Sequence, residues 1–224
     1  MIPPDDASGT RLMPPATLEE YLETIYKISQ DGPVRPTAIA ESVGVSGPTV
    51  TVTLRRLEAH GLIERDGTDV LLTDEGLAKA LDIVRRHRVS ERLLVDVLGL
   101  DWEAAHEEAC RLEHALSPRV LEALERFLGD PDSCPHGHPI PGADGSVLAA
   151  RGHSLAESPL DTPLKVLRVS EDVSVLGYLG EIGLRPGASV TVLSSEPNGG
   201  PLVIQVDGAT RAIARDVARS VEVR

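Results

Sequence analysis

The segment HEEACRLEH, residues 106–114, concentrates side chains that bind metals. It holds two imidazoles, a thiol and a carboxylate, at His106, Cys110, Glu113 and His114. Successive side chains on a helix turn by about 100°, so these four positions share one face within about a third of the circumference. Transition metals in proteins are bound by imidazole, thiolate and carboxylate groups. The segment therefore predicts a metal site on a helix.

Two other segments offer further ligands at helical spacing. His87 and Glu91 are four positions apart, and Glu20 and Glu23 are three apart. Taken alone, a His/Glu pair at this spacing is more often a solvated helix face, and two glutamates in a first turn complement the helix dipole. A single cysteine is often a small buried apolar residue. The combination of eight such groups on three predicted helices favours metal binding.

The ligand types narrow the choice of metal. Mn²⁺ and Fe²⁺ have the weakest intrinsic affinities among these divalent ions, so a site for either must select through geometry and hard ligands. Glu20, Glu23, Glu91 and Glu113 supply such oxygen ligands, which favours six-coordinate Mn²⁺ or Fe²⁺ over tetrahedral Zn²⁺. Cys110 is a softer ligand and pulls the preference toward Fe²⁺, unless it contributes mainly its backbone carbonyl.

Length and composition limit the class of protein. The chain has 224 residues, of which 41% are hydrophobic and 2% aromatic, so its cores must be built from Leu, Val, Ile and Ala. No apolar run reaches the roughly 18 residues that a membrane-spanning helix needs, and no secretory signal opens the chain. Two cysteines are too few for a disulfide framework. We therefore expect a soluble, cytoplasmic protein without a membrane partner.

The net charge of −13 is unfavourable for a nucleic-acid partner, because phosphate contacts dominate that affinity. Two arrangements would remove the objection. The basic residues can cluster on one surface, or bound divalent cations can offset part of the negative charge. The second arrangement fits a chain with so many potential metal ligands.

The N-terminal part is expected to begin with a mobile tail and a helix. Residues 1–16 hold four prolines, and the following TLEEYLETIYKI has apolar residues at helical spacing with Thr17 as its N-cap. Thr37 is then expected to start a short helix that ends at Gly44, and Ser46 to cap a second one. Two short helices joined by a turn containing glycine are typical of a helix-turn-helix.

The next segment, LIERDGTDVLLT, predicts two short strands around a turn at Asp66 and Gly67. Following a helix-turn-helix, such a hairpin is the wing of a winged helix. A generic three-helix bundle with a hairpin is the alternative, because helix-turn-helix patterns have a real false-positive risk.

The middle of the chain is predicted to be helical and its C-terminal part to be built of strands. Three helices with wide apolar faces suit a dimerisation domain, in which the leucine- and valine-rich stretch 93–98 forms either a dimer seam or monomer core. A stretch rich in Gly, Ala, Ser and Pro predicts a linker, and the β-branched runs after it predict a small β-barrel of roughly five strands with a short helical piece at SVLGYLGEIG. The expected organisation is mainly α with β: a flexible tail at 1–16, a winged helix-turn-helix at 17–77, a dimerisation and metal-binding domain at 78–141, a linker at 142–160 and the barrel at 161–224.

Six segments carry a resemblance to a known family: EEYLETIY (19–26), SGPTVTVTLRRLEAHGLI (46–63), RRHRVSERLL (85–94), HEEACRLEH (106–114), HPIPG (138–142) and LGEIGLRPGASV (179–190). On these segments the chain resembles the metal-dependent regulators of the diphtheria toxin repressor type, including their manganese-responsive branch. The resemblance implies that the C-terminal barrel is an SH3-like, FeoA-type domain. It further implies a repressor of manganese or iron uptake genes that binds double-stranded operator DNA as a homodimer, with one or two dimers per operator, when Mn²⁺ or Fe²⁺ is bound.

Two metal sites per subunit follow from the resemblance. The primary site comprises Glu20, Cys110, Glu113 and His114, with Glu23 as a further carboxylate; the second comprises His87, Glu91 and His106, with Glu171 or Asp172 from the C-terminal domain. Glu20 and Glu23 follow the manganese-responsive branch, whereas Cys110 follows the iron-responsive members, so the sequence is a hybrid. Arg88 matches a residue that helps to bind an anion, and His138 stands at the position of its neutral partner.

The family's DNA-facing positions lie in and just before the recognition segment. Ser46, Pro48, Thr49 and Thr51 match family positions that face DNA, and the candidates for phosphate contacts are Arg35, Thr37, Arg55 and Arg56. Val52 replaces a polar residue and can contact a thymine methyl group. Small hydroxyl-bearing residues make few base-specific bonds, so much of the binding is expected to come from backbone positioning and DNA shape.

Two other classes of function remain as alternatives. HEEAC is one letter from the HExxH motif of zinc hydrolases, in which Glu107 would be the general base. A catalytic zinc needs an open coordination position and a substrate cleft, however, and the sequence offers no further catalytic constellation. A metal-buffering protein would need no helix-turn-helix. We therefore expect no enzyme.

Overall fold

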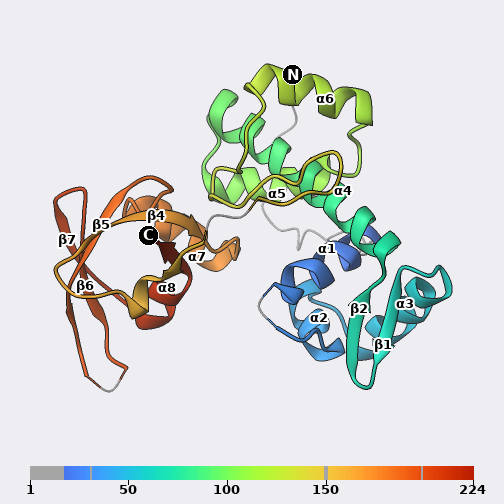
Figure 1. Ribbon diagram of the computed structural model, residues 1–224, viewed down its shortest axis with the longest axis horizontal. Coiled ribbons are helices and arrows are strands. Elements are labelled where there is room, and N and C mark those ends of the chain that lie inside the picture. Colours follow the sequence, from blue (N-terminus) through green and yellow to red (C-terminus); the bar gives the residue numbers. More distant parts are fainter. Residues whose placement is uncertain (1–17, 31, 149–150, 198) are drawn as a thin grey trace, which may run out of the picture. The chain divides into compact units, whose positions relative to one another are not determined.

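The computed structural model describes residues 18–30, 32–148, 151–197 and 199–224. The expected tail at 1–16 and the expected cap Thr17 lie outside these ranges. The chain divides into two compact units, with the boundary between Ala80 and Leu81, and each unit is described by itself (Figure 1).

The first unit is a winged helix-turn-helix, as the sequence predicted. Its elements are α1 (Leu18–Ser29), α2 (Pro36–Val43), α3 (Gly47–Ala59), β1 (Ile63–Asp66) and β2 (Asp69–Leu72). Ser46 caps α3 by accepting a hydrogen bond from the Thr49 amide, and Gly44 ends α2 at a φ of 71°. The predicted start of α2 at Thr37 is wrong by one residue, because Pro36 already occupies the first turn, where its missing N–H costs nothing.

Periodic burial on the helices builds the core of this unit. Tyr21, Leu22 and Ile25 of α1 and Leu54 and Leu57 of α3 are at most 2% exposed. These residues recur at helical spacing, so each helix turns one apolar stripe inward and a polar face outward. β1 and β2 pair antiparallel and form the wing (Figure 1).

The second unit begins with helices. They are α4 (Asp74–Arg92, which crosses the boundary between the units), the π-helical turn η1 (Leu93–Val97), α5 (Trp102–Leu112) and α6 (Pro118–Leu128). The helical segment that begins with α4 therefore ends in a π-helical turn, followed by Gly99 at a φ of 72°. Ser117 caps α6 by accepting a hydrogen bond from the Val120 amide, and Gly129 ends it in the left-handed conformation.

The leucine- and valine-rich stretch after α4 is divided between core and surface. Leu94 packs with Ala105 and Ala109 of α5 in a small buried cluster. Val97 and Leu98 are 47% and 59% exposed. Part of the stretch is therefore monomer core, while its exposed part has the character that a dimer seam requires.

The C-terminal part is an antiparallel sheet with short helices. Its elements are β3 (His153–Ser154), η2 (Leu155–Glu157), β4 (Pro163–Val169), α7 (Val173–Glu181), β5 (Ser189–Ser195), β6 (Leu202–Val206), β7 (Ala209–Ile213), α8 (Arg215–Arg219) and β8 (Val221–Val223). The strand order is β3-β8-β4-β5-β6-β7. Register shifts in β4 and in β5 mark bulges, which bend the sheet around its core.

This sheet differs from the prediction at two places. β7 and α8 carry many polar residues and were not predicted as separate elements. β3 and η2 lie inside the segment 142–160 that was expected to be a linker, and Leu155 is fully buried in the C-terminal core. A composition rich in small residues therefore concealed a short packed segment.

Trp102, the single tryptophan of the chain, joins the helices to the sheet. It stands at the start of α5 and belongs to the same buried cluster as Leu176, Leu179 and other residues of the C-terminal part. α5, which carries candidate ligands, therefore packs on α7 of the C-terminal part within the second unit.

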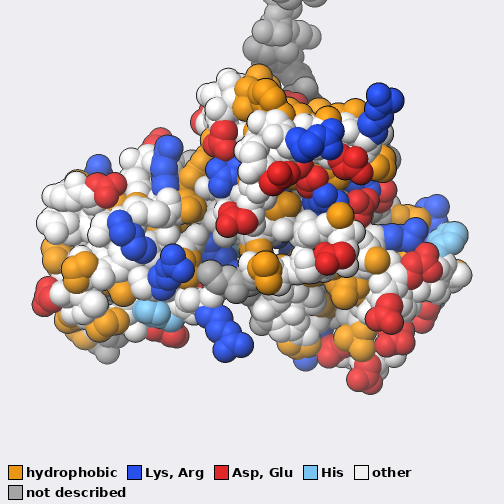
Figure 2. All heavy atoms as spheres, turned by 45° about the horizontal axis from the view of Figure 1, so that its top comes forward, with side chains coloured by type: hydrophobic (Ala, Val, Ile, Leu, Met, Phe, Trp, Pro, Cys, Tyr) orange, Lys and Arg blue, Asp and Glu red, His pale blue; other side chains and the backbone are white. Residues whose placement is uncertain are grey.

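Two surface properties bear on the choice of partner. Within the described ranges, no helix combines the length and the apolar character needed to cross a membrane. On the face shown in Figure 2, basic and acidic side chains are interspersed rather than gathered into one basic block. This face therefore offers no single basic surface for DNA, and candidate contacts to DNA phosphates are assigned to individual helices and strands.

Candidate metal centre

Helices α4 and α5 position the central candidate ligands. Asp101 caps α5, accepting a hydrogen bond from the Ala104 amide at 2.9 Å, and this fixes where the helix begins. His106 and Cys110 then follow one helical turn apart on α5. His87 and Glu91 are likewise one turn apart on α4. The two helices bring these four side chains together inside the second unit.

His87, Glu91 and His106 form a nearly equilateral triangle of ligand atoms. The distances are 3.0 Å from His87 Nε2 to Glu91 Oε1, 2.9 Å from His106 Nδ1 to that same oxygen, and 3.2 Å between the two nitrogens. With metal–ligand bonds of about 2.1 Å, neighbouring ligands lie about 3.0 Å apart in an octahedron and about 3.4 Å apart in a tetrahedron. The triangle therefore matches one face of an octahedral site.

Because the triangle is buried, a charge on any of its side chains must be compensated by a nearby opposite charge or by hydrogen bonds. His87 is 1% exposed and Glu91 is fully buried. Burial opposes the charge on Glu91, but His87⁺ and hydrogen bonds to three imidazoles lower the pKa of that carboxyl well below its usual value. Burial likewise opposes the charge on His87, but Glu91, Cys110 and Glu113 raise its pKa well above the usual range. Without a metal, protonated imidazoles therefore supply the positive charge that Glu91 requires.

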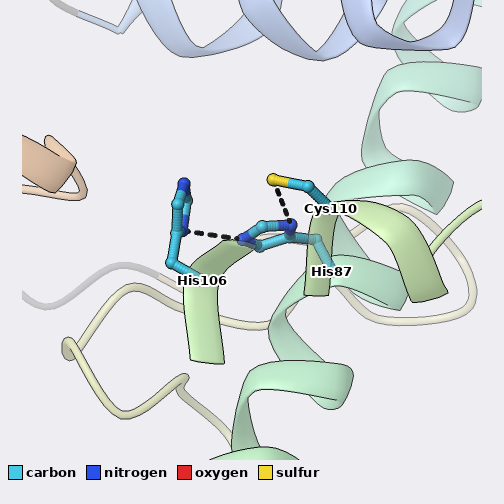
Figure 3. A group of neighbouring side chains, drawn as sticks. All are labelled: His87, His106 and Cys110. Carbon is cyan, nitrogen blue, oxygen red and sulfur yellow. Dashed lines mark hydrogen bonds between the residues drawn. The ribbon is translucent and has the colours of Figure 1, made fainter. Parts of the chain in front are cut away.

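Cys110 and His106 lie against different ring nitrogens of His87 (Figure 3). The Cys110 sulfur is 4.0 Å from His87 Nδ1, and the Glu113 carboxylate is 2.6 Å from the same nitrogen. Burial raises the pKa of Cys110, but hydrogen bonds to His106 and His87 and their positive charge lower it to about 7. A substantial fraction of this thiol is therefore in the thiolate form that binds metals.

Glu113 and His114 stand just beyond the end of α5, although the sequence predicted that they continue its ligand face. The α-helix ends at Leu112, and Glu113 keeps a helical backbone at the next position. Glu113 is 1% exposed, and His114 Nε2 lies 3.3 Å from its Oε1. Cys110, Glu113 and His114 thus gather on the Nδ1 side of His87, as the helical spacing indicated.

The structure adds two residues that the sequence analysis did not propose as ligands, Cys134 and His136. With Glu91 and Glu171 they form a group whose ligand atoms lie within 4.8 Å of one another. The Cys134 sulfur is 3.8 Å from His136 Nδ1 and 4.0 Å from Glu171 Oε1. The sequence feature that could have identified them is the Cys-x-His spacing at 134–136. It lies in a segment without helical or strand periodicity, where the sequence predicts only the end of the helical region.

Of the two alternatives Glu171 and Asp172, only Glu171 faces this group. Asp172 is exposed and caps α7, accepting a hydrogen bond from the Ser174 amide at 2.9 Å. Glu171 lies 3.3 Å from Arg88 Nε, and Arg88 also donates to the Pro139 carbonyl at 2.6 Å. The spacing of adjacent acidic residues cannot decide which one caps a helix; in this structure Asp172 caps α7, and its role as a ligand stays a prediction.

His138, which stands where the family has a neutral partner of Arg88, is occupied elsewhere. Its Nε2 donates to the Val169 carbonyl at 2.8 Å. Burial lowers the pKa of His138, so it is neutral near pH 7. Glu171 lies beside Arg88, so an internal carboxylate stands next to this guanidinium where the resemblance implied an anion.

Glu20 and Glu23 lie on α1, in the first compact unit. Glu23 forms an ion pair with Lys27 at 2.9 Å, one turn further along the helix. That these two carboxylates join the ligands of the second unit stays a prediction.

The arrangement does not favour the hydrolase alternative. Glu107, the general base of an HExxH-like site, has a 55% exposed side chain and lies 4.0 Å from Arg111. It therefore faces solvent on α5, away from the buried triangle that includes its neighbour His106.

All nine predicted DNA-contacting residues are at the surface of the first unit. Val50, Leu54 and Leu57 bury the inner face of α3. The outer face and the start of α2 expose Arg35, Thr37, Ser46, Pro48, Thr49, Thr51, Val52, Arg55 and Arg56. Val52 is 58% exposed, although it is apolar. A recognition helix with a free outer face is the arrangement that helix-turn-helix proteins insert into the major groove.

Three family models match the chain in succession. Residues 15–69 match "Iron dependent repressor, N-terminal DNA binding domain", and residues 73–142 match "Iron dependent repressor, metal binding and dimerisation domain". Residues 153–224 match "FeoA domain". The last match begins at β3, in agreement with the packing of Leu155.

Curated relatives match over nearly their whole length. The chain is 39% identical to the iron-dependent repressor IdeR of Mycobacterium leprae, covering 92% of this chain and 96% of the relative. It is 36% identical to the diphtheria toxin repressor of Corynebacterium efficiens, with 92% and 94% covered.

Solved structures give the same result for the fold. A manganese-dependent transcriptional repressor in complex with manganese is 34% identical, with a TM-score of 0.86 over 92% of this chain and 99% of that one. ScaR with bound Cd²⁺ is 32% identical, with a TM-score of 0.82 over 93% and 99%.

Proposed function

Because this chain belongs to the diphtheria toxin repressor family of metal-dependent transcriptional repressors, we propose that it is a DNA-binding repressor activated by a divalent cation. The observation that carries the proposal is the presence, in one chain, of an exposed recognition helix and buried groups of metal ligands. It acts in the cytoplasm as a homodimer, with one or two dimers on each operator, and represses genes of manganese or iron uptake.

Each domain has its own proposed function, and the domains follow one another along the chain. Residues 17–77 bind DNA, residues 78–141 bind metal and dimerise, and residues 161–224 form the SH3-like domain. The segment 153–157, which packs into that last domain through Leu155, is added to it and shortens the linker.

We propose two cation-binding regions per subunit, and the chemistry of the donors supports them. The first takes Cys110, Glu113 and His114 of the second unit, with Glu20 and Glu23 of α1. The other takes the triangle His87, Glu91 and His106, near which Cys134, His136 and Glu171 also lie. Two buried atoms there, Glu91 Oε2 and His136 Nε2, have no hydrogen-bond partner in the described part of the chain. Buried polar atoms without partners are rare, and a cation is one way to satisfy them.

The geometry of the triangle supports Mn²⁺ or Fe²⁺ as the effector. Its edges fit an octahedral face, and six-coordinate geometry with oxygen and imidazole ligands suits these ions better than tetrahedral Zn²⁺. Glu20 and Glu23 favour Mn²⁺ through their hard oxygens, whereas the Cys110 thiolate favours Fe²⁺. Of Mn²⁺ and Fe²⁺, the effector is therefore the ion that binds more tightly to a site with several carboxylates and one thiolate.

The proposed switch converts repulsion into coordination. Without a cation, the carboxylates of α1 and of the second unit repel one another. A cation bound by both sets ties α1 to the metal-binding domain. Because α1 belongs to the same compact unit as α3, this restricts the position of the recognition helix in a dimer. Two half-sites on DNA lie about one helical turn apart, so a fixed spacing of the two recognition helices increases affinity for the operator.

The test is selection of fragmented genomic DNA by the purified protein with Mn²⁺, with Fe²⁺ in the absence of oxygen, and with chelator. We expect a few discrete fragments to be enriched with metal and lost with chelator. The cation that gives enrichment at the lower free concentration identifies the effector.

A matched pair of variants makes the test specific. Glu113→Gln removes a proposed ligand and should abolish enrichment, whereas His153→Gln, at an exposed position of the C-terminal part, should leave it unchanged. Enrichment that is equal with metal and with chelator would contradict metal activation. No enrichment with any metal would contradict the repressor function itself.

A further inference from the structure

Helix α5 ends before two of the proposed ligands. Its last residue is Leu112, and Glu113 and His114 follow in the turn that closes the helix. The backbone at a helix end is held less firmly than the interior, because the last carbonyl groups have no partner within the helix. The positions of these two ligands therefore depend on contacts from elsewhere in the fold.

Arg86 of α4 supplies such a contact. Its Nη1 donates to the carbonyl oxygen of Glu113 at 3.0 Å. This carbonyl belongs to the peptide group that joins Glu113 to His114, so a single hydrogen bond restrains the backbone between the two ligands. A hydrogen bond from a charged donor is roughly twice as strong as one between neutral groups.

The next residue of α4 contacts the same glutamate. His87 Nδ1 lies 2.6 Å from Glu113 Oε2, and Glu113 is 1% exposed. Helix α4 therefore holds Glu113 at two points, the carboxylate through His87 and the carbonyl through Arg86. A cation that takes the carboxylate competes with the first of these contacts but not with the second.

The guanidinium of Arg86 is itself oriented by a carboxylate. Asp82, one turn earlier on α4, accepts a hydrogen bond from its Nη2. The side chain of Asp82 is 53% exposed, so this ion pair adds little to the stability of the fold. It does direct the guanidinium, and it offsets the positive charge that would otherwise oppose a divalent cation nearby.

We propose that Arg86 is a positioning residue of the first cation-binding region, in which it holds the backbone between Glu113 and His114 in the arrangement that a cation requires. The proposal rests on the proposed function, because that function makes Glu113 and His114 ligands. Residues that orient metal ligands without touching the ion typically contribute about 10–100-fold to metal affinity.

Arg85, the preceding residue of α4, provides a matched control. Its guanidinium donates to both carboxylate oxygens of Glu125 on α6, at 2.6 Å each. The side chains of Arg85 and Arg86 are 16% and 15% exposed, so the two are equally buried. Removing either arginine should destabilise the packing of a helix on α4, but only the loss of Arg86 should disturb the proposed ligands.

Cys110 gives the first cation-binding region a spectroscopic signal of its own. The chain has two cysteines, so Cys110 is the one remaining thiol in a Cys134→Ala parent protein. A thiolate bound to Co²⁺ produces a charge-transfer absorption in the near ultraviolet, which carboxylate and imidazole ligands do not produce.

The experiment compares the reduced, full-length parent with the same protein carrying Arg86→Met, Arg86→Lys or Arg85→Met. Each protein is titrated with Co²⁺ in the absence of oxygen while the thiolate absorption is followed. Thermal unfolding of the metal-free proteins verifies that each variant folds and measures its loss of stability.

A positioning role predicts a distinct pattern. Arg86→Met should raise the free Co²⁺ concentration at half-maximal absorption by about 10–100-fold. Arg86→Lys should recover part of the affinity, because an ammonium group can donate to the same carbonyl. Arg85→Met should keep the titration of the parent, even if its thermal unfolding shifts as far as that of Arg86→Met.

Two results would overturn the proposal. One is an Arg86→Met titration that coincides with that of the parent. The other is an equal weakening in Arg86→Met and Arg85→Met, which would indicate a general loosening of α4 instead of the positioning of ligands.

Failure of the proposed function would look different. If the parent itself developed no thiolate absorption, the first cation-binding region would be wrong as proposed, and this inference would be wrong with it. The repressor function is judged by metal-dependent DNA selection, and a failure of that selection would leave the Co²⁺ titrations unaffected.

Discussion

Raising the pH from 6.5 to 8.5 should strengthen Mn²⁺ binding to the His87–Glu91–His106 triangle. Burial lowers the pKa of His106, but hydrogen bonds to Cys110 and Glu91 outweigh it and raise the pKa to about 9. A cation can bind His106 Nδ1 only when that nitrogen carries no proton, so below pH 9 each binding event must displace one. The affinity therefore increases as the pH rises toward 9 and levels off above it.

The magnitude follows from the protonated fraction of His106. At pH 7, about two units below its pKa, about 1% of the imidazole is neutral, against about half at pH 9, so binding is about 50-fold weaker than at pH 9. Well below the pKa the change is about tenfold per pH unit, or about 1.4 kcal/mol. The pKa of His87 is also raised, so a second displaced proton can bring the slope toward two. Isothermal titration calorimetry in buffers of different ionisation enthalpy measures both the affinity and the protons released.

Two variants separate this effect from other titrations. His106→Gln should reduce the slope of log affinity against pH by about one. His138→Gln should leave it unchanged, because burial lowers the pKa of His138 and its Nε2 already donates to Val169. An affinity that does not change between pH 6.5 and 8.5, or a slope equally steep in His106→Gln, would refute the reasoning.

Three further predictions concern packing, capping and DNA contact. Leu155→Ala should destabilise the protein by about 2–5 kcal/mol in thermal unfolding, because it removes a fully buried side chain; a destabilisation no greater than that of the control Leu148→Ala, at an 89% exposed position, would count against the packing of this segment. Ser46→Ala should cost about 1 kcal/mol in urea unfolding, since Ser46 caps α3, and an unchanged midpoint would show that the cap is dispensable. Arg56→Gln should reduce the slope of log DNA affinity against log salt by about one if Arg56 contacts a phosphate, whereas Arg219→Gln in α8 should not; equal slopes in the two variants would exclude that contact.

Local patterns in the sequence were sufficient for most of the helices and for their caps. Ser46 and Ser117 each accept a hydrogen bond from an amide three residues ahead, and Gly129 ends α6 in the left-handed conformation. These signals are reliable because capping depends on a few neighbouring residues. The same locality explains the failures: β7 lacks a regular apolar alternation, and Leu155 is concealed within a segment rich in small residues.

The candidate ligands likewise include some that local sequence patterns predict and some that they do not. The His87/Glu91 and His106/Cys110 pairs could be predicted from the sequence, because a helix brings residues four apart onto one face whatever surrounds it.

By itself, then, the sequence determined the family, the winged helix and the candidate ligands that lie on α4 and α5. Only the tertiary structure decided that Cys134, His136 and Glu171 meet Glu91. These residues lie on segments without periodicity, whose positions depend on long-range contacts. Arg92 donates to the Ser133 carbonyl at 2.6 Å, and Arg88 donates to that of Pro139 and lies beside Glu171. Such contacts join residues far apart in the chain, and no local pattern records them, which is why the group that includes Cys134 and His136 appeared only in the folded protein.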